Sequence, residues 1–132
     1  MKLLEVVSIV KSLGLPGGDF ALHGSAPLLA YGLISETNDV DIVSRGAAWH
    51  HATTLAPTQR GSHDAVVRPR EGVEIFNGWL SDDANELIDG ATIRDEIPFV
   101  SLQAVLRFKR QLNRPKDLEH IRLIEHYLKS NG

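Results

Sequence analysis

The residue types best suited to chemistry lie in the stretch FALHGSAPLLAYGLISETNDVDIVS, residues 20–44. Asp39 and Asp41 flank Val40 within an apolar run typical of a strand. Because strand side chains alternate between faces, the two carboxylates would share one face, about 7 Å apart along the chain. They would repel each other unless a cation lay between them. The spacing therefore predicts a site for a divalent metal with oxygen ligands, Mg²⁺ or Mn²⁺.

Gly24 and Ser25 end an earlier apolar run, where a strand is predicted to pass into a short helix. Backbone N–H groups and the helix dipole favour phosphate at such a junction. Glycine allows the ligand to approach the backbone, and serine can cap the helix or donate to a phosphate oxygen. A phosphate-binding turn and a carboxylate pair are thus predicted within one strand–helix–strand unit.

This combination resembles the nucleotidyltransferase superfamily, whose signature is Gly-Ser, a helix, and two acids separated by one apolar residue. The small bacterial domains with the pattern Gly-(Gly/Ser)…Thr-x-Asp-hydrophobic-Asp, including those of toxin–antitoxin type, are the most similar in layout. Here the pattern reads Gly24-Ser25…Thr37-Asn38-Asp39-Val40-Asp41. The resemblance extends to a later acid on a strand, Glu74, and to a C-terminal Lys…Arg-Pro-Lys-Asp stretch, so it covers most of the chain.

Glu74 lies among apolar residues in a predicted strand, where Val73 and Ile75 share one face while Glu74 and Phe76 share the other. Read by itself, such a glutamate is a residue of an exposed sheet face. The resemblance to nucleotidyltransferases implies a third metal ligand that joins Asp39 and Asp41.

Lys109 follows Val105 by four residues and Leu106 by three, so it is predicted to lie on the apolar face of a helix. An inward-facing ammonium needs a carboxylate or an anionic ligand as partner. Asp117 falls in the first turn of the next helix, where an acid offsets the helix dipole. The resemblance implies instead that Lys109 and Asp117 complete the wall of the active site.

The resemblance implies transfer of a nucleoside monophosphate from an NTP such as ATP, with release of pyrophosphate, to an acceptor that is a small molecule, a protein or an RNA. Asp39, Asp41, Glu74 and Lys109 would be the catalytic residues, with the three acids as metal ligands. Nucleotide-binding residues would be Gly24, Ser25, Thr37, Lys109 and Asp117. Arg107, Arg110 or Arg114 could add positive charge near the leaving group.

One residue departs from the family pattern. Related domains often carry an arginine before the Thr-x-Asp-x-Asp run, and Ser35 stands at that position here. Two alternatives to the transferase therefore stay open. One is a nucleotide-binding or regulatory module of the same fold, a toxin–antitoxin component without turnover. The other is a different metal-dependent enzyme acting on phosphoryl groups or phosphate esters.

Composition limits the class of protein. The chain has 132 residues, 42% of them hydrophobic, no cysteine and a net charge of −3, which fits one globular domain over residues 1–132 without disulfides or thiolate metal sites. It lacks the overall positive charge of general nucleic-acid binders. The N-terminal segment carries Glu5 and Lys11 within its apolar pattern, so we expect no signal peptide, no membrane span and a cytoplasmic location. With no second domain to form a lid, we expect a homodimer or a small partner protein.

Periodicity predicts a mixed α/β (α+β) fold in which helices flank a mixed sheet and the C-terminus forms a helical hairpin. The expected strands are Phe20–His23, Asn38–Val43, Ser62–Arg68, Gly72–Trp79 and an edge strand Ala91–Ile97. The expected helices are Leu3–Leu13, Ser25–Tyr31, Ala47–Leu55, one capped by Ser101 and one after Arg114-Pro115 with the buried stripe Leu118, Ile121, Ile124 and Leu128. Asp82–Leu87 is expected to form a single helical turn or a loop. The adjacent pair His50-His51 points in different directions on its helix, so it predicts a helix surface and no chelating site.

Overall fold

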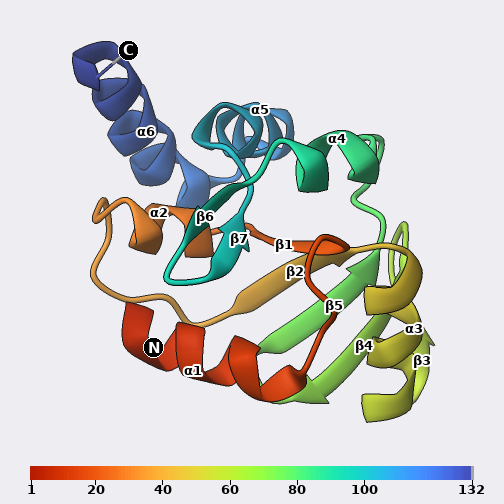
Figure 1. Ribbon diagram of the computed structural model, residues 1–132. Coiled ribbons are helices and arrows are strands. Elements are labelled where there is room, and N and C mark those ends of the chain that lie inside the picture. The colour runs from red at the N-terminus through yellow and green to blue at the C-terminus, as the bar shows by residue number, and fades with distance from the viewer. Residues whose placement is uncertain (132) are drawn as a thin grey trace.

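The computed structural model describes residues 1–131 and contains a seven-stranded mixed sheet with helices on both faces (Figure 1). The strand order is β3-β4-β5-β2-β1-β7-β6. The strands are β1 (Phe20–His23), β2 (Val40–Ser44), β3 (Thr58–Arg60), β4 (Ala65–Arg70), β5 (Val73–Asn77), β6 (Thr92–Arg94) and β7 (Ile97–Phe99). The predicted mixed sheet is confirmed.

The centre of the sheet is built from strands that are distant in sequence. β1 runs antiparallel to β2, with Phe20 opposite Ser44 and His23 opposite Asp41. β2 runs parallel to β5, which places Asp41 beside Glu74. Because paired residues project from the same face of a sheet, this register brings His23, Asp41 and Glu74 into one row.

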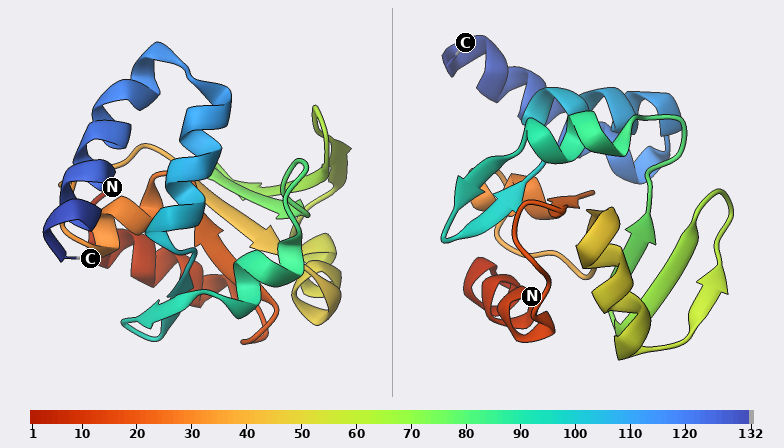
Figure 2. Two further views of the ribbon diagram at one scale, coloured as in Figure 1. Left: turned by 90° about the horizontal axis from the view of Figure 1, so that it is seen from above. Right: turned by 45° about the vertical axis from the view of Figure 1, so that its right-hand side comes forward.

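The helices form two layers, and Figure 2 shows the sheet between them. On one face lie α1 (Leu3–Leu13) and α3 (Gly46–Leu55). On the other lie α4 (Ala84–Asp89), α5 (Leu102–Leu112) and α6 (Leu118–Asn131), with a short 3₁₀ turn at Pro115–Asp117 before α6. The small helix α2 (Ala26–Ala30) contributes to the apolar cores of both faces.

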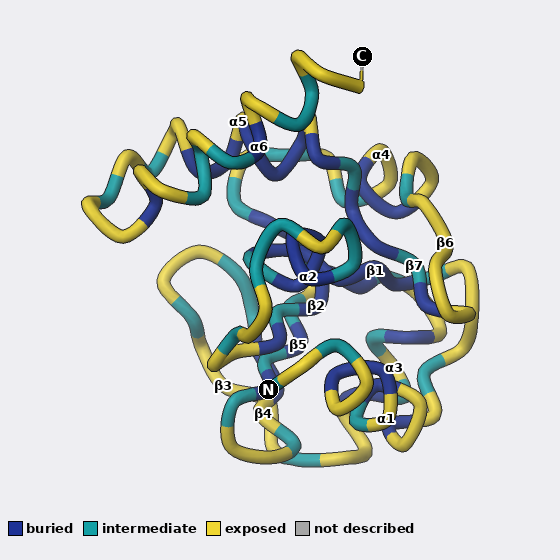
Figure 3. The backbone as a smooth tube through the Cα atoms, turned by 90° about the vertical axis from the view of Figure 1, so that its left-hand side faces the viewer, coloured by how far each residue is buried: buried dark blue, intermediate teal, exposed yellow. Residues whose placement is uncertain are grey.

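Alternation along β2 explains both cores. Val40 and Ile42 are fully buried against α1 and α3, whereas Val43 is buried against α5. Figure 3 shows the central strands buried, in contrast to the exposed outer parts of β3 and the C-terminal turns of α6. Asp41 lies on the α5 side of the sheet, where it is only partly covered.

The single edge strand predicted at Ala91–Ile97 is wrong. The segment is a hairpin in which β6 pairs antiparallel with β7, and β7 pairs parallel with β1. Asp95 and Glu96 both have positive φ, 52° and 66°, which suits a two-residue hairpin turn. The sequence lacks the glycine that normally marks such a turn, and for that reason the break was not predicted.

Three smaller differences follow from tertiary packing. Leu118 is 58% exposed and does not belong to the buried stripe of α6, in which Ile124 is fully buried. β2 begins at Val40, so Asp39 immediately precedes the strand. β3 is entirely exposed, and without an apolar face it leaves no periodic signal in the sequence.

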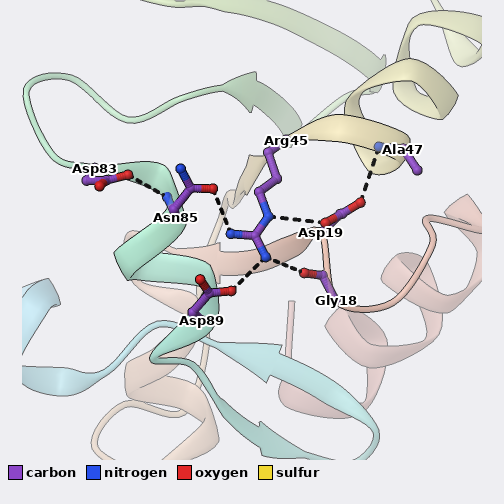
Figure 4. Close-up of polar contacts among 7 residues, drawn as sticks. All are labelled: Gly18, Asp19, Arg45, Ala47, Asp83, Asn85 and Asp89. Carbon is purple, nitrogen blue, oxygen red and sulfur yellow. Dashed lines mark hydrogen bonds and ion pairs between the residues drawn. The ribbon is translucent and has the colours of Figure 1, made fainter.

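Arg45 ties three segments together at the end of the β1–β2 pair that is remote from Asp41 (Figure 4). Its guanidinium donates to Asp19 Oδ1 at 3.1 Å, Asn85 Oδ1 at 2.8 Å, Gly18 O at 2.9 Å and Asp89 Oδ1 at 2.6 Å. Asp19 Oδ2 also accepts a hydrogen bond from the N–H of Ala47, in the first turn of α3. We call Gly18, Asp19, Arg45, Asn85 and Asp89 the Arg45 cluster.

Every helix within residues 1–131 is too short or too polar to cross a bilayer.

Candidate functional site

A cleft of about 760 Å³ lies on the α5 side of the sheet, between the edge of the α5–α6 layer and the uncovered part of β2 and β5. All eight residues that the sequence predicted for the site line this cleft: Gly24, Ser25, Thr37, Asp39, Asp41, Glu74, Lys109 and Asp117. They come from five segments of the chain, which the sheet register and the packing of α5 bring together. Their chemical roles remain predictions.

We call Asp39, Asp41 and Glu74 the acidic cluster. The pKa of Asp41 is raised to about 6, first by burial and then by the charges of Glu74 and Asp39, against the opposing effect of Lys109 and Arg114. A raised pKa means that the charged form of the carboxylate is disfavoured, here by desolvation first and by neighbouring negative charge second. The cluster therefore has excess negative charge that a cation would relieve.

Glu74 already has a cationic partner. Arg68 Nε donates to Glu74 Oε2 at 2.7 Å, and the two side chains are 47% and 32% exposed. Arg68 also contacts the Gln59 side chain on β3. A polar row therefore runs across four neighbouring strands, from Asp41 through Glu74 and Arg68 to Gln59.

The carboxylates of the cleft fit a Mg²⁺ or Mn²⁺ ion that takes its remaining ligands from water and a substrate. Among residues 1–131 no three His, Cys, Asp or Glu side chains are placed to hold an ion by themselves. Mg²⁺, however, commonly uses one or two carboxylates together with water and substrate phosphates. Asp39 and Asp41 suit this mode, and Glu74 could join them only by releasing Arg68.

The backbone at Gly24 allows Asp41 to approach closely. Gly24 has a φ of 67°, and a Cβ at this position would lie 2.6 Å from Asp41 Oδ2. Any larger residue would therefore be strained and would also displace the carboxylate. This close approach is the physical reason for glycine in the Gly-Ser turn.

The Gly24 amide itself is occupied. It donates to His23 Nδ1 at 2.7 Å, so it does not point to a phosphate in this structure. The following helix α2 has only five residues and carries Pro27, which has no N–H. The helix dipole and backbone amides expected to bind phosphate are thus weaker than predicted, and the Ser25 hydroxyl remains as a donor.

Lys109 faces inward as predicted and is 2% exposed. Its Nζ lies 3.6 Å from Asp117 Oδ1 and 3.4 Å from Ser25 Oγ. Burial lowers the pKa of Lys109, and the charge of Asp117 opposes that shift. Lys109 therefore has the carboxylate partner that its burial requires, and it also reaches the Gly-Ser turn.

Asp117 is held as a carboxylate. Burial raises its pKa, but hydrogen bonds and charge from Arg114, together with the charge of Lys109, lower it overall. Arg114 donates from Nε at 2.7 Å and from Nη2 at 3.1 Å to the two carboxylate oxygens. Asp117 thus fixes both cations beside the cleft.

Sequence analysis missed two histidines near the site. His120 Nδ1 lies 3.5 Å from Ser25 Oγ and lines the cleft; its position three residues after Asp117, on the same helical face, was the available signal. His23 is fully buried, stacks on Trp79 with ring centroids 4.2 Å apart, and leaves Nε2 without a hydrogen-bond partner. The available signal for His23 was its position at the end of an apolar strand, directly before Gly24.

Thr37 and Ser35 occupy the approach to β2. The Thr37 hydroxyl donates to Asp39 O at 3.3 Å, and its N–H donates to Met1 O at 2.9 Å. These contacts give Thr37 a role in holding the turn that presents Asp39. Ser35, at the position of the family arginine, is exposed.

Comparison of the chain with protein-family models, with curated proteins and with solved structures finds no match.

Proposed function

We propose that the cleft binds a nucleoside triphosphate with Mg²⁺ or Mn²⁺ and transfers its nucleotidyl group to an acceptor. One observation carries the proposal: a carboxylate cluster with excess negative charge faces a group of cations across a single cleft. Asp41 has a pKa raised to about 6, while Lys109, Arg114 and Lys116 line the same cleft. A metal–triphosphate complex carries charges of both signs and matches this arrangement.

In this reaction an acceptor oxygen attacks the α-phosphorus. A new P–O bond forms, the bond to the bridging α–β oxygen breaks, and pyrophosphate leaves with the electron pair; the acceptor proton passes to a carboxylate of the acidic cluster. The metal would be held by Asp39 and Asp41 and would stabilise negative charge on the transferred group. Lys109, fixed by Asp117, and the Ser25 hydroxyl would orient the phosphates.

The test is pyrophosphate release from each of the four NTPs with Mg²⁺ or Mn²⁺, together with labelling of acceptors in a cell lysate from α-labelled nucleotide. We expect Asp39→Asn and Asp41→Asn to reduce release about 100-fold or more, since each removes a charge that acts in the transition state. Asp95→Asn is the matched control, because it removes the same charge from an exposed turn with φ of 52°.

A nucleotide-binding module without turnover is the second candidate. It is favoured by the Arg68–Glu74 ion pair, which occupies the third acid, and by Ser35 in place of the family arginine. Calorimetry would then show nucleotide binding that is lost in Lys109→Ala, while no NTP or metal yields pyrophosphate. Phosphate release without a nucleotide adduct would instead indicate a different phosphoryl enzyme.

A further inference from the structure

Arg68 belongs to none of the motifs in the sequence, but it contacts the acidic cluster through Glu74. It lies in the irregular part of β4, where the register with β5 shifts between Val67 and Arg70. This irregularity is a position where a side chain can be re-aimed. Arg68 bridges Glu74 on β5 and Gln59 on β3, so it lies directly beside the acidic cluster.

A guanidinium and a divalent cation would compete for the negative charge of the Glu74 carboxylate. Arg68 Nε lies 2.7 Å from Glu74 Oε2, so a metal ion at that carboxylate would lie beside the positive charge of the guanidinium. Both side chains are partly exposed, and ion pairs of this kind are weak and screened by solvent. The contact is therefore strong enough to occupy Glu74 and weak enough for a doubly charged ion to displace it.

We propose that Arg68 competes with the divalent cation for Glu74. While the ion pair is closed, the guanidinium charge disfavours a metal ion at Glu74; when it opens, Glu74 becomes a third ligand and Arg68 is released towards β3. This inference rests on the proposed function, because it assumes that the acidic cluster binds a metal. It makes Arg68 a positioning residue that acts through Glu74.

Mn²⁺ is the probe, and its binding to the full chain is followed from the loss of the electron paramagnetic resonance signal of free Mn²⁺. We expect Arg68→Gln to tighten Mn²⁺ binding about fivefold, the upper range for loss of an exposed ion pair. In a Glu74→Gln background the same substitution should have no effect. Arg68→Lys, which keeps the charge but not the forked reach to both partners, should give a smaller increase.

Arg70→Gln is the matched control, because it removes the same charge from another exposed side chain two residues further along β4. The proposal is overturned if Arg68→Gln leaves Mn²⁺ affinity unchanged, if Arg70→Gln tightens it equally, or if the gain persists without Glu74. In those cases the proposed function still stands when Asp41→Asn removes Mn²⁺ binding. If Mn²⁺ binding is insensitive to Asp41→Asn, the metal site and this inference fail together.

Discussion

The two ends of the β1–β2 pair both carry charged clusters, and they differ in how completely the charges are compensated. At one end Arg45 donates four hydrogen bonds and contacts two carboxylates, Asp19 and Asp89. At the other end burial, together with the charges of two further acids, raises the pKa of Asp41 to about 6. His23, opposite Asp41 in the ladder, leaves a buried ring nitrogen unpaired.

We interpret the Arg45 end of the strand pair as structural and the Asp41 end as part of the candidate site. Both carboxylates of the Arg45 cluster accept hydrogen bonds from Arg45, so neither needs a ligand as a partner, and the cluster holds α3 and α4 on the sheet. The Asp41 end retains unfavourable electrostatics that folding alone would not select. The proposed function would explain them, because a bound metal ion would offset the charge of Asp41.

The largest effect on stability should come from the cation that partly compensates the Asp41 end. Lys109→Ala removes a buried ammonium and leaves Asp117 with Arg114 as its remaining ion partner. Breaking a buried pair in this way costs about 3–5 kcal/mol, and we expect the lower part of that range because Arg114 remains. The measurement is urea-induced unfolding monitored by far-UV circular dichroism.

Lys116→Ala is the control for this prediction, since Lys116 also lines the cleft but is exposed. Its free energy of unfolding should stay near that of the wild-type protein. Equal destabilisation of the two variants would mean that Lys109 acts through the general field of the cleft and not through its buried pair.

The Arg45 cluster should give a smaller loss of stability that leaves the cleft intact. Arg45→Met removes the hydrogen bonds to Asp19, Asn85 and Asp89 while it keeps the aliphatic stem, and we expect a cost of about 2 kcal/mol. Mn²⁺ or nucleotide affinity should be unchanged. A concurrent loss of binding would show that the two ends of the strand pair are coupled, and the comparison drawn above would fail.

Much of the fold was predictable because it depends on local patterns. α1 ends at Gly14, in the left-handed conformation, and Ser101 caps α5 through a hydrogen bond from Ala104 N. Strand β1 was predicted with its correct limits. β3 and the β6–β7 turn were not predictable, because exposed three-residue strands and a turn without glycine carry no periodic or compositional signal.

The residues of the cleft were also predictable, but their partners were not. Inward-facing Lys109 implied a carboxylate or an anionic ligand as its partner, and Asp117 is the carboxylate beside it. The ion pair between Arg68 and Glu74 depends on the pairing of β4 with β5 and on the irregular register between them. The hydrogen bond from the Gly24 amide to His23 Nδ1 depends on one side-chain rotamer. Strand register and rotamers arise from tertiary packing, which a single sequence does not display.

The smallest predicted change is a gain in stability, opposite in sign to the losses expected for Lys109→Ala and Arg45→Met. It tests directly whether the charge of Asp41 is left uncompensated. Asp41 has a folded-state pKa of about 6 against an ordinary value of 3.8, so its contribution to stability is full below pH 3.8 and is lost as the pH rises through 6. At neutral pH this corresponds to about 3 kcal/mol at most, and Asp41→Asn should recover about 1–2 kcal/mol of it because asparagine is still partly buried and polar. We therefore expect the variant to be more stable than the wild-type protein at pH 7.5 and to lose that advantage steadily between pH 6 and pH 4, as measured by urea unfolding of both proteins at each pH.

Asp95→Asn is the control for this prediction, and it should change stability little at either pH. If Asp41→Asn destabilises the protein at pH 7.5, the charge of Asp41 is compensated within the fold, and the distinction between a satisfied and an unsatisfied end of the strand pair is wrong.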